Sequence, residues 1–88
     1  MKRRVHRSDL NQESIIAALR KIGCQVYVIG EPFDLLAWYR GRWSVLEVKR
    51  PKGAYTDLQV RDMALLGPTA VKTVRSDADA IYAVCEGL

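Results

Sequence analysis

Two acidic residues and a lysine in the middle of the chain are placed to support metal-dependent chemistry. Glu47 and Lys49 are two residues apart in the mostly apolar run Val45–Lys49, and Asp34 opens the apolar run before it. Side chains alternate along a strand, so Glu47 and Lys49 would point to one face, and an antiparallel hairpin would bring Asp34 across from them. Oxygen ligands of this kind suit magnesium or manganese rather than zinc. The carboxylates would hold the cation against a phosphodiester, and the lysine would orient the attacking water or stabilise developing negative charge.

A purely structural explanation of these residues is also open. An isolated Glu-x-Lys pair is more often a salt bridge than a site, and Asp34 would then only begin a turn. The position of the pattern favours chemistry, because the charges interrupt runs that otherwise indicate buried strands. Such strands rarely contain acids or ammonium groups unless these are paired or bound to a metal.

The elements that must position these residues alternate between helix and strand. A helix is predicted to begin near Asp9 or Asn11, with Asp9 and Gln12 at capping-box spacing, and to end at Gly23. The later patterns predict strands at 26–29, 34–39, 43–50 and 70–74, a helix from Thr56 to about Leu66, and a last helix capped by Ser76. The resulting order is α-β-β-β-α-β-α. A crossover joins the third and fourth strands, which should therefore be parallel, so we expect an α/β domain with a mixed four-stranded sheet flanked by helices.

Size and composition indicate one small domain spanning residues 1–88, with a basic tail at residues 1–8. The formal net charge of +4 favours a polyanionic partner such as DNA, although charge alone is a weak indication. Cys24 and Cys85 lack metal-ligand spacing, and we expect them to be reduced core residues of a cytoplasmic protein. No signal peptide and no run long enough to span a bilayer is visible, so we expect no membrane partner.

Together these motifs resemble the virus-type replication-repair nuclease (VRR-Nuc) domain of the PD-(D/E)XK nuclease superfamily. The resemblance covers nearly the whole chain and rests on Asn11–Glu13, Asp34–Leu36, Arg40–Arg42, Leu46–Lys49, Thr56–Gln59 and Val74–Ser76. It implies a restriction-endonuclease-like core. The chain departs from the family pattern at Phe33, which stands between Pro32 and Asp34 where the family usually has proline directly before the aspartate.

The resemblance also assigns roles to individual residues. Asp34, Glu47 and the main-chain carbonyl of Val48 would bind Mg²⁺ or Mn²⁺, and Lys49 would be the catalytic lysine. Glu13 and Gln59 would lie at the edge of the same site and complete the catalytic set.

Two of these residues have simpler explanations. Glu13 lies early in the first predicted helix, where an acid complements the helix dipole. Gln59 has capping-box spacing from Thr56, and we expect that serving both the cap and the site would require two side-chain rotamers.

Four basic residues are candidates for DNA binding. Arg50 and Lys52 directly follow Lys49 in a loop, where they would contact phosphates or simply be solvated. Arg40 and Arg42 form the hairpin turn with Gly41 between them. The aromatic residues around this turn are expected in the core or at a subunit interface: Trp38, Tyr39 and Trp43.

The sequence therefore predicts a metal-dependent, structure-selective DNA endonuclease, that is, a phosphodiester hydrolase. The resemblance implies a homodimer that cuts branched DNA such as four-way (Holliday) junctions, and suggests a viral or phage origin, which would place the protein in the host cytoplasm. Two alternatives remain open. One is a nuclease for flaps or splayed ends, and the other is a non-catalytic nucleic-acid-binding module of the same fold, against which the intact Asp, Glu and Lys set argues.

Overall fold

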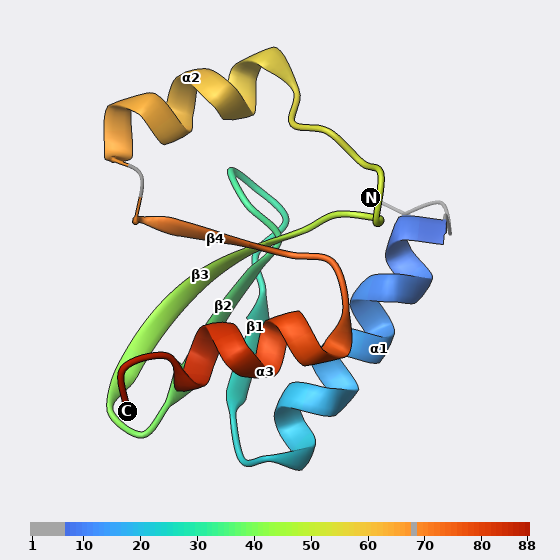
Figure 1. The fold of residues 1–88 in the computed structure, drawn as a ribbon, viewed down its shortest axis with the longest axis vertical. Helices are drawn as coiled ribbons and strands as arrows, with labels where there is room; N and C mark the ends of the chain where they lie inside the picture. The colour runs from blue at the N-terminus through green and yellow to red at the C-terminus, as the bar shows by residue number, and fades with distance from the viewer. Residues whose placement is uncertain (1–6, 68) are drawn as a thin grey trace.

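The described part of the chain folds as three helices around one four-stranded sheet. The computed structural model describes residues 7–67 and 69–88, with side chains from Asn11 onward, so residues 1–6 of the expected basic tail lie outside the described residues. The elements are α1 (Arg7–Lys21), β1 (Gln25–Val28), β2 (Leu35–Tyr39), β3 (Arg42–Val48), α2 (Asp57–Leu66), β4 (Val71–Val74) and α3 (Asp77–Cys85). The strand order is β1-β2-β3-β4, with β3 and β4 parallel and the other neighbours antiparallel (Figure 1). The expected α/β class with a mixed four-stranded sheet flanked by helices is confirmed.

The element ends show which local signals were decisive. Thr56 caps α2 with a complete capping box, and Ser76 caps α3, both as predicted. The predicted cap at Asp9 is wrong, because α1 begins at Arg7 and Asp9 lies inside its first turn. An acid is favourable in a first turn as well as at a cap, so its spacing alone does not fix the helix start. β3 ends at Val48 rather than Arg50, since its partner β4 ends opposite at Val74.

The hydrophobic core lies between one face of the sheet and the helices α1 and α3. Buried residues alternate with more exposed ones along β2 and the first part of β3, whereas the last three residues of β3 are all buried because Glu47 is also covered on the other face. Burial of this apolar surface is the main stabilising contribution to the fold. The fully enclosed members include Ile15, Leu19, Leu35, Leu46, Val74 and Val84.

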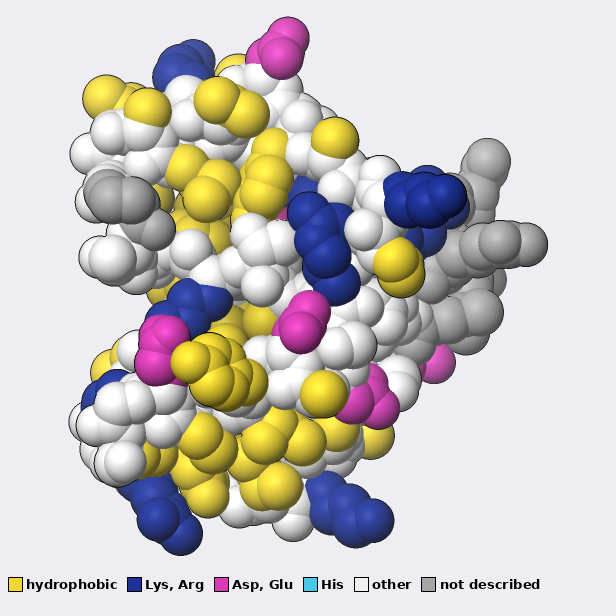
Figure 2. All heavy atoms as spheres, in the orientation of Figure 1, with side chains coloured by type: hydrophobic (Ala, Val, Ile, Leu, Met, Phe, Trp, Pro, Cys, Tyr) yellow, Lys and Arg dark blue, Asp and Glu magenta, His cyan; other side chains and the backbone are white. Residues whose placement is uncertain are grey.

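Helix α2 lies on the other side of the sheet and stands apart from it (Figure 1). None of its residues is buried, and Leu58, Val60, Leu65 and Leu66 are exposed on its surface. Figure 2 shows hydrophobic side chains gathered over this helix. The helix therefore keeps its position through particular contacts rather than through a buried apolar face.

The hairpin tryptophans do not enter the core. Trp38 and Trp43 are 36% and 58% exposed, on the sheet face that α1 and α3 leave open. Tyr27 approaches Trp43 with ring centroids 6.2 Å apart, whereas Tyr39 packs against the core cluster. The core-packing alternative is thus wrong for both tryptophans, and their role at a subunit interface stays a prediction.

Within residues 7–67 and 69–88, no helix combines the length and the apolar character that crossing a membrane requires.

Candidate active site

The carboxylate of Asp34 links the start of β2 to the end of β3. Its Oδ2 accepts a hydrogen bond from the Val48 N–H at 2.8 Å, and its own carbonyl accepts from the Ile29 and Gly30 amides. The aspartate is therefore fixed from both its main chain and its side chain. It lies beside the Val48 peptide, whose carbonyl the resemblance makes a metal ligand.

Glu47 is a buried carboxylate with one satisfied and one unsatisfied oxygen. The residue is only 4% exposed. Its Oε2 receives the Gln59 amide at 2.7 Å and faces the Lys49 ammonium at 3.2 Å. Its Oε1 is buried and has no hydrogen-bond partner in the part of the chain that the structure describes. Burial, and then the charge of Asp34, raise the pKa of Glu47 above its ordinary value, and the hydrogen bonds from Gln59 and Lys49 only partly oppose this.

Gln59 bridges the two charged residues of β3 from the first turn of α2. Its Nε2 donates to Glu47, while its Oε1 accepts from Lys49 Nζ at 2.9 Å and from the Thr56 N–H at 3.2 Å. The capping role and the site role are thus served in one rotamer. The expectation that two rotamers are needed was wrong, because an amide has a donor end and an acceptor oxygen with two lone pairs.

Lys49 has a further neighbour that the sequence did not identify. Its ammonium lies over the ring of Tyr55, 5.0 Å from the ring centroid. The Tyr55 hydroxyl shares a hydrogen bond with Thr73 Oγ1 on β4. Thr73 is the register partner of Glu47 across the β3–β4 ladder, so this tyrosine belongs to the same cluster.

The loop after Lys49 is held by side chains that point inward. Asn11 Nδ2 donates to the carbonyls of Lys49 and Arg75, at 3.2 and 3.4 Å. The Arg75 guanidinium donates to the carbonyls of Arg50 and Gly53, each at 2.8 Å. The side chains of Arg50 and Lys52 stay exposed beside the site, where phosphate contacts were predicted.

Arg40 and Arg42 lie at the opposite end of the β2–β3 hairpin, away from Asp34 and Glu47. Arg40 is exposed over the Tyr39 ring, while Arg42 turns inward and donates to the Val84 carbonyl at 3.0 Å near the end of α3. The structure thus brings Arg50 and Lys52 to the site, and not this second pair.

Glu13 is exposed on α1. Among the described residues, no hydrogen bond or ion pair joins it to Asp34, Glu47 or Lys49. Its predicted place in the catalytic set stays a prediction.

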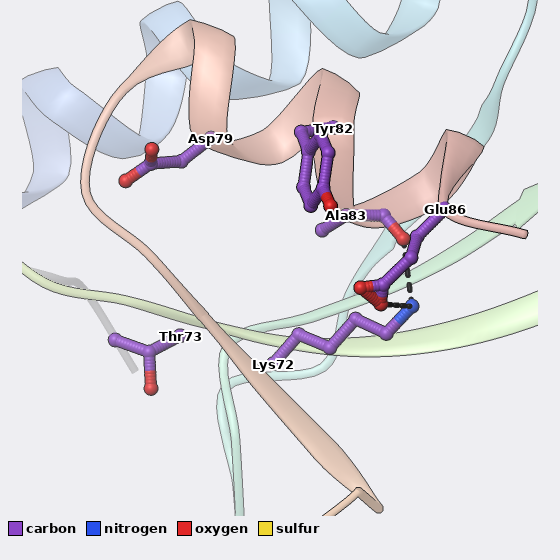
Figure 3. Close-up of a pocket in the computed structure, with 6 residues that line it drawn as sticks. All are labelled: Lys72, Thr73, Asp79, Tyr82, Ala83 and Glu86. Atoms are coloured by element: carbon purple, nitrogen blue, oxygen red, sulfur yellow. Dashed lines mark hydrogen bonds and ion pairs between the residues drawn. The ribbon is translucent and has the colours of Figure 1, made fainter.

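A separate open pocket of about 320 Å³ lies between β4 and α3. Its cation, Lys72, donates to the Ala83 carbonyl at 2.7 Å and faces Glu86 at 4.0 Å (Figure 3). Lys72 is therefore occupied in capping the end of α3, as Arg42 is. Asp34, Glu47 and Lys49 are not among the residues that line this pocket.

The cluster fits a hard divalent cation. Two acids share a site, one of them has a buried oxygen that no described residue contacts, and their mutual repulsion favours a bound positive charge. No group of three or more His, Cys, Asp and Glu residues comes together in residues 7–67 and 69–88. This donor set suits Mg²⁺, which binds through one or two carboxylates and keeps several waters, better than a closed zinc site.

Comparison of the chain with protein-family models, with curated proteins and with solved structures gave no match. The geometry of the cluster must therefore support any functional proposal by itself. Tyr55, a member of the cluster, carried no signal in the sequence. Asn11 and Arg75, which hold the loop after Lys49, lie in stretches on which the resemblance rests.

Proposed function

We propose that this protein is a metal-dependent, structure-selective DNA endonuclease of the PD-(D/E)XK type, with a restriction-endonuclease-like core and VRR-Nuc-like motifs. One observation carries the proposal. Glu47 Oε1, which is buried and has no partner among the described residues, lies in a cluster with Asp34 and with the ammonium of Lys49. A salt bridge that serves only stability rarely leaves a buried carboxylate oxygen without a partner.

In this proposal Asp34, Glu47 and the Val48 carbonyl hold Mg²⁺ or Mn²⁺. When bound, the cation supplies charge neutralisation at the phosphate and stabilises the leaving oxygen. Lys49 donates hydrogen bonds toward the attacking water or a phosphate oxygen. Gln59 keeps the Lys49 ammonium beside Glu47. Arg50 and Lys52 contact neighbouring phosphates, which positions the DNA without reading its sequence.

The proposed substrate is branched DNA, with the four-way junction first, and the proposed assembly is a homodimer. One domain carries one set of catalytic residues, so paired cuts across a junction require two copies related by a two-fold axis. The exposed aromatic residues Tyr27, Trp38 and Trp43 and the apolar surface of α2 supply area for such an interface.

The test is cleavage of labelled four-way junction, flap and linear duplex DNA, with magnesium and with excess chelator. Asp34→Asn and Lys49→Ala should abolish or strongly reduce cutting while the DNA is still bound. Asp62→Asn, at an acid on α2 that pairs with its neighbour Arg61, is the matched control and should cut normally.

Each departure from this pattern has a definite meaning. Full cutting in chelator would remove the metal from the proposal. Faster cutting of flaps than of junctions would favour the flap nuclease, and tight binding without cutting under any metal would favour the non-catalytic module. Sedimentation at micromolar concentration tests the dimer, and a strictly monomeric protein would end the paired-cut proposal.

A further inference from the structure

The ammonium of Lys49 is surrounded by groups from three different segments. Glu47 lies two residues earlier on β3, with its Oε2 at 3.2 Å, and Gln59 approaches from α2, with its Oε1 at 2.9 Å. The third contact is with the ring of Tyr55, whose centroid lies 5.0 Å from Lys49 Nζ. A cation within about 6 Å of an aromatic face is attracted by the ring quadrupole, and more strongly where water is excluded.

Tyr55 is itself anchored to the sheet. It lies in the loop between β3 and α2, and its hydroxyl bonds to Thr73 Oγ1. Thr73 presents this hydroxyl away from α3 (Figure 3), and its register partner on β3 is Glu47. The ring is therefore fixed relative to the same two strands that position the carboxylate.

We infer that Tyr55 is a positioning residue that holds the Lys49 ammonium in place for phosphodiester cleavage. A lysine side chain has a flexible four-carbon stem, and its ordering costs conformational entropy. Among the described residues, Glu47 and Gln59 make the polar contacts to the ammonium, and the ring adds a third contact that restricts it further. The inference rests on the proposed nuclease function and adds to it a residue that acts through Lys49 rather than on the DNA.

The experiment compares Tyr55→Leu, Tyr55→Phe and the control Tyr82→Leu, a tyrosine exposed on α3. Single-turnover cleavage of junction DNA gives the rate, and titration in calcium or chelator gives the affinity. Tyr55→Leu should slow cleavage about 3- to 30-fold, the range expected for a cation–π contact, with DNA affinity unchanged. Tyr55→Phe keeps the ring and should stay within about threefold of the wild type, since only the tether to Thr73 is lost. Tyr82→Leu should have no effect.

A double-mutant cycle separates positioning from a general structural role. In a Lys49→Ala background, Tyr55→Leu should cause no further loss, because the group that it positions is already absent. Thr73→Val, which leaves the ring in place, should reproduce Tyr55→Phe. Thermal unfolding of every variant identifies any that fails to fold. If Tyr55→Leu does not fold, the comparison of Tyr55→Phe and Thr73→Val with the wild type tests the role of Tyr55.

The outcomes distinguish this inference from the proposed function. A wild type that cuts no DNA overturns the nuclease itself. A wild type that cuts, with Tyr55→Leu equally fast or with losses that add fully to those of Lys49→Ala, overturns only the role of Tyr55.

Discussion

Replacement of Gln59 by alanine should loosen α2 from the rest of the protein. The substitution removes the bonds from the Gln59 amide to Glu47 and to Lys49 and the capping bond to the Thr56 N–H. Bonds to charged groups contribute about 1.5–3 kcal/mol each, and a neutral one about 1 kcal/mol. The loss should be smaller than their sum, because the Lys49–Glu47 pair survives and water enters the half-buried site. We expect a cost of about 2–3 kcal/mol in the free energy of unfolding.

Thermal unfolding in chelator measures this cost. For a domain of this size each kcal/mol lowers the melting temperature by about 4–8 °C, so Gln59→Ala should melt roughly 8–24 °C below the wild type. Arg61→Ala is the matched control, because it also places alanine on α2 but removes a side chain that is 66% exposed. Amide hydrogen exchange adds a local readout, since α2 buries no residue and should lose protection first.

A melting temperature of Gln59→Ala within about 2 °C of that of Arg61→Ala would contradict this prediction. Amides of α2 that exchange at the wild-type rate in Gln59→Ala would contradict it too. Either result would mean that something other than the Gln59 bridge holds the helix over the site.

Three further predictions concern the charges around the site. Because the pKa of Glu47 is raised, the folded state binds a proton on this carboxylate more tightly than the unfolded state does. The stability of the metal-free protein should therefore fall as pH rises from the ordinary pKa of 4.5 through the raised pKa. Thermal melts at a series of pH values should show this fall in the wild type and not in Glu47→Gln. Arg75→Gln should weaken junction binding about fivefold more than Arg61→Gln in an equilibrium titration. Both variants lose one positive charge, but Arg75 also donates hydrogen bonds to the loop that contains Arg50. Glu13→Gln should slow cleavage in a rate assay yet change the free energy of unfolding by less than about 0.5 kcal/mol, because Glu13 is exposed. A native cleavage rate would mean that Glu13 serves only to complement the helix dipole.

Local sequence periods were sufficient to predict the framework of the site. The two-residue period of a strand placed Glu47 and Lys49 on one face, and the turn at Arg40–Arg42 returned the chain so that Asp34 came beside the end of β3. The capping box at Thr56 is a contact within four residues, so it too could be predicted without tertiary information.

The rest depends on how the elements lie against one another. The dual contact of Gln59 exists because the first turn of α2 lies over the end of β3, which no local pattern encodes. Tyr55 has no periodic or motif signal, and its role follows only from the position of Thr73 on β4. Arg42 was predicted to contact DNA, yet in the structure it donates to the Val84 carbonyl of α3.

Part of the positive charge of this protein is occupied in building the fold. Arg42, Lys72 and Arg75 all donate to main-chain carbonyls, so the donor end of each is engaged within the protein. The formal charge therefore overstates how many counterions DNA binding can release. If a dimer contacts four phosphates, through Arg50 and Lys52 of each protomer, the logarithm of its affinity should fall with the logarithm of salt concentration with a slope of about −3.6. A steeper measured slope would mean that further Lys and Arg residues of each protomer also contact phosphates.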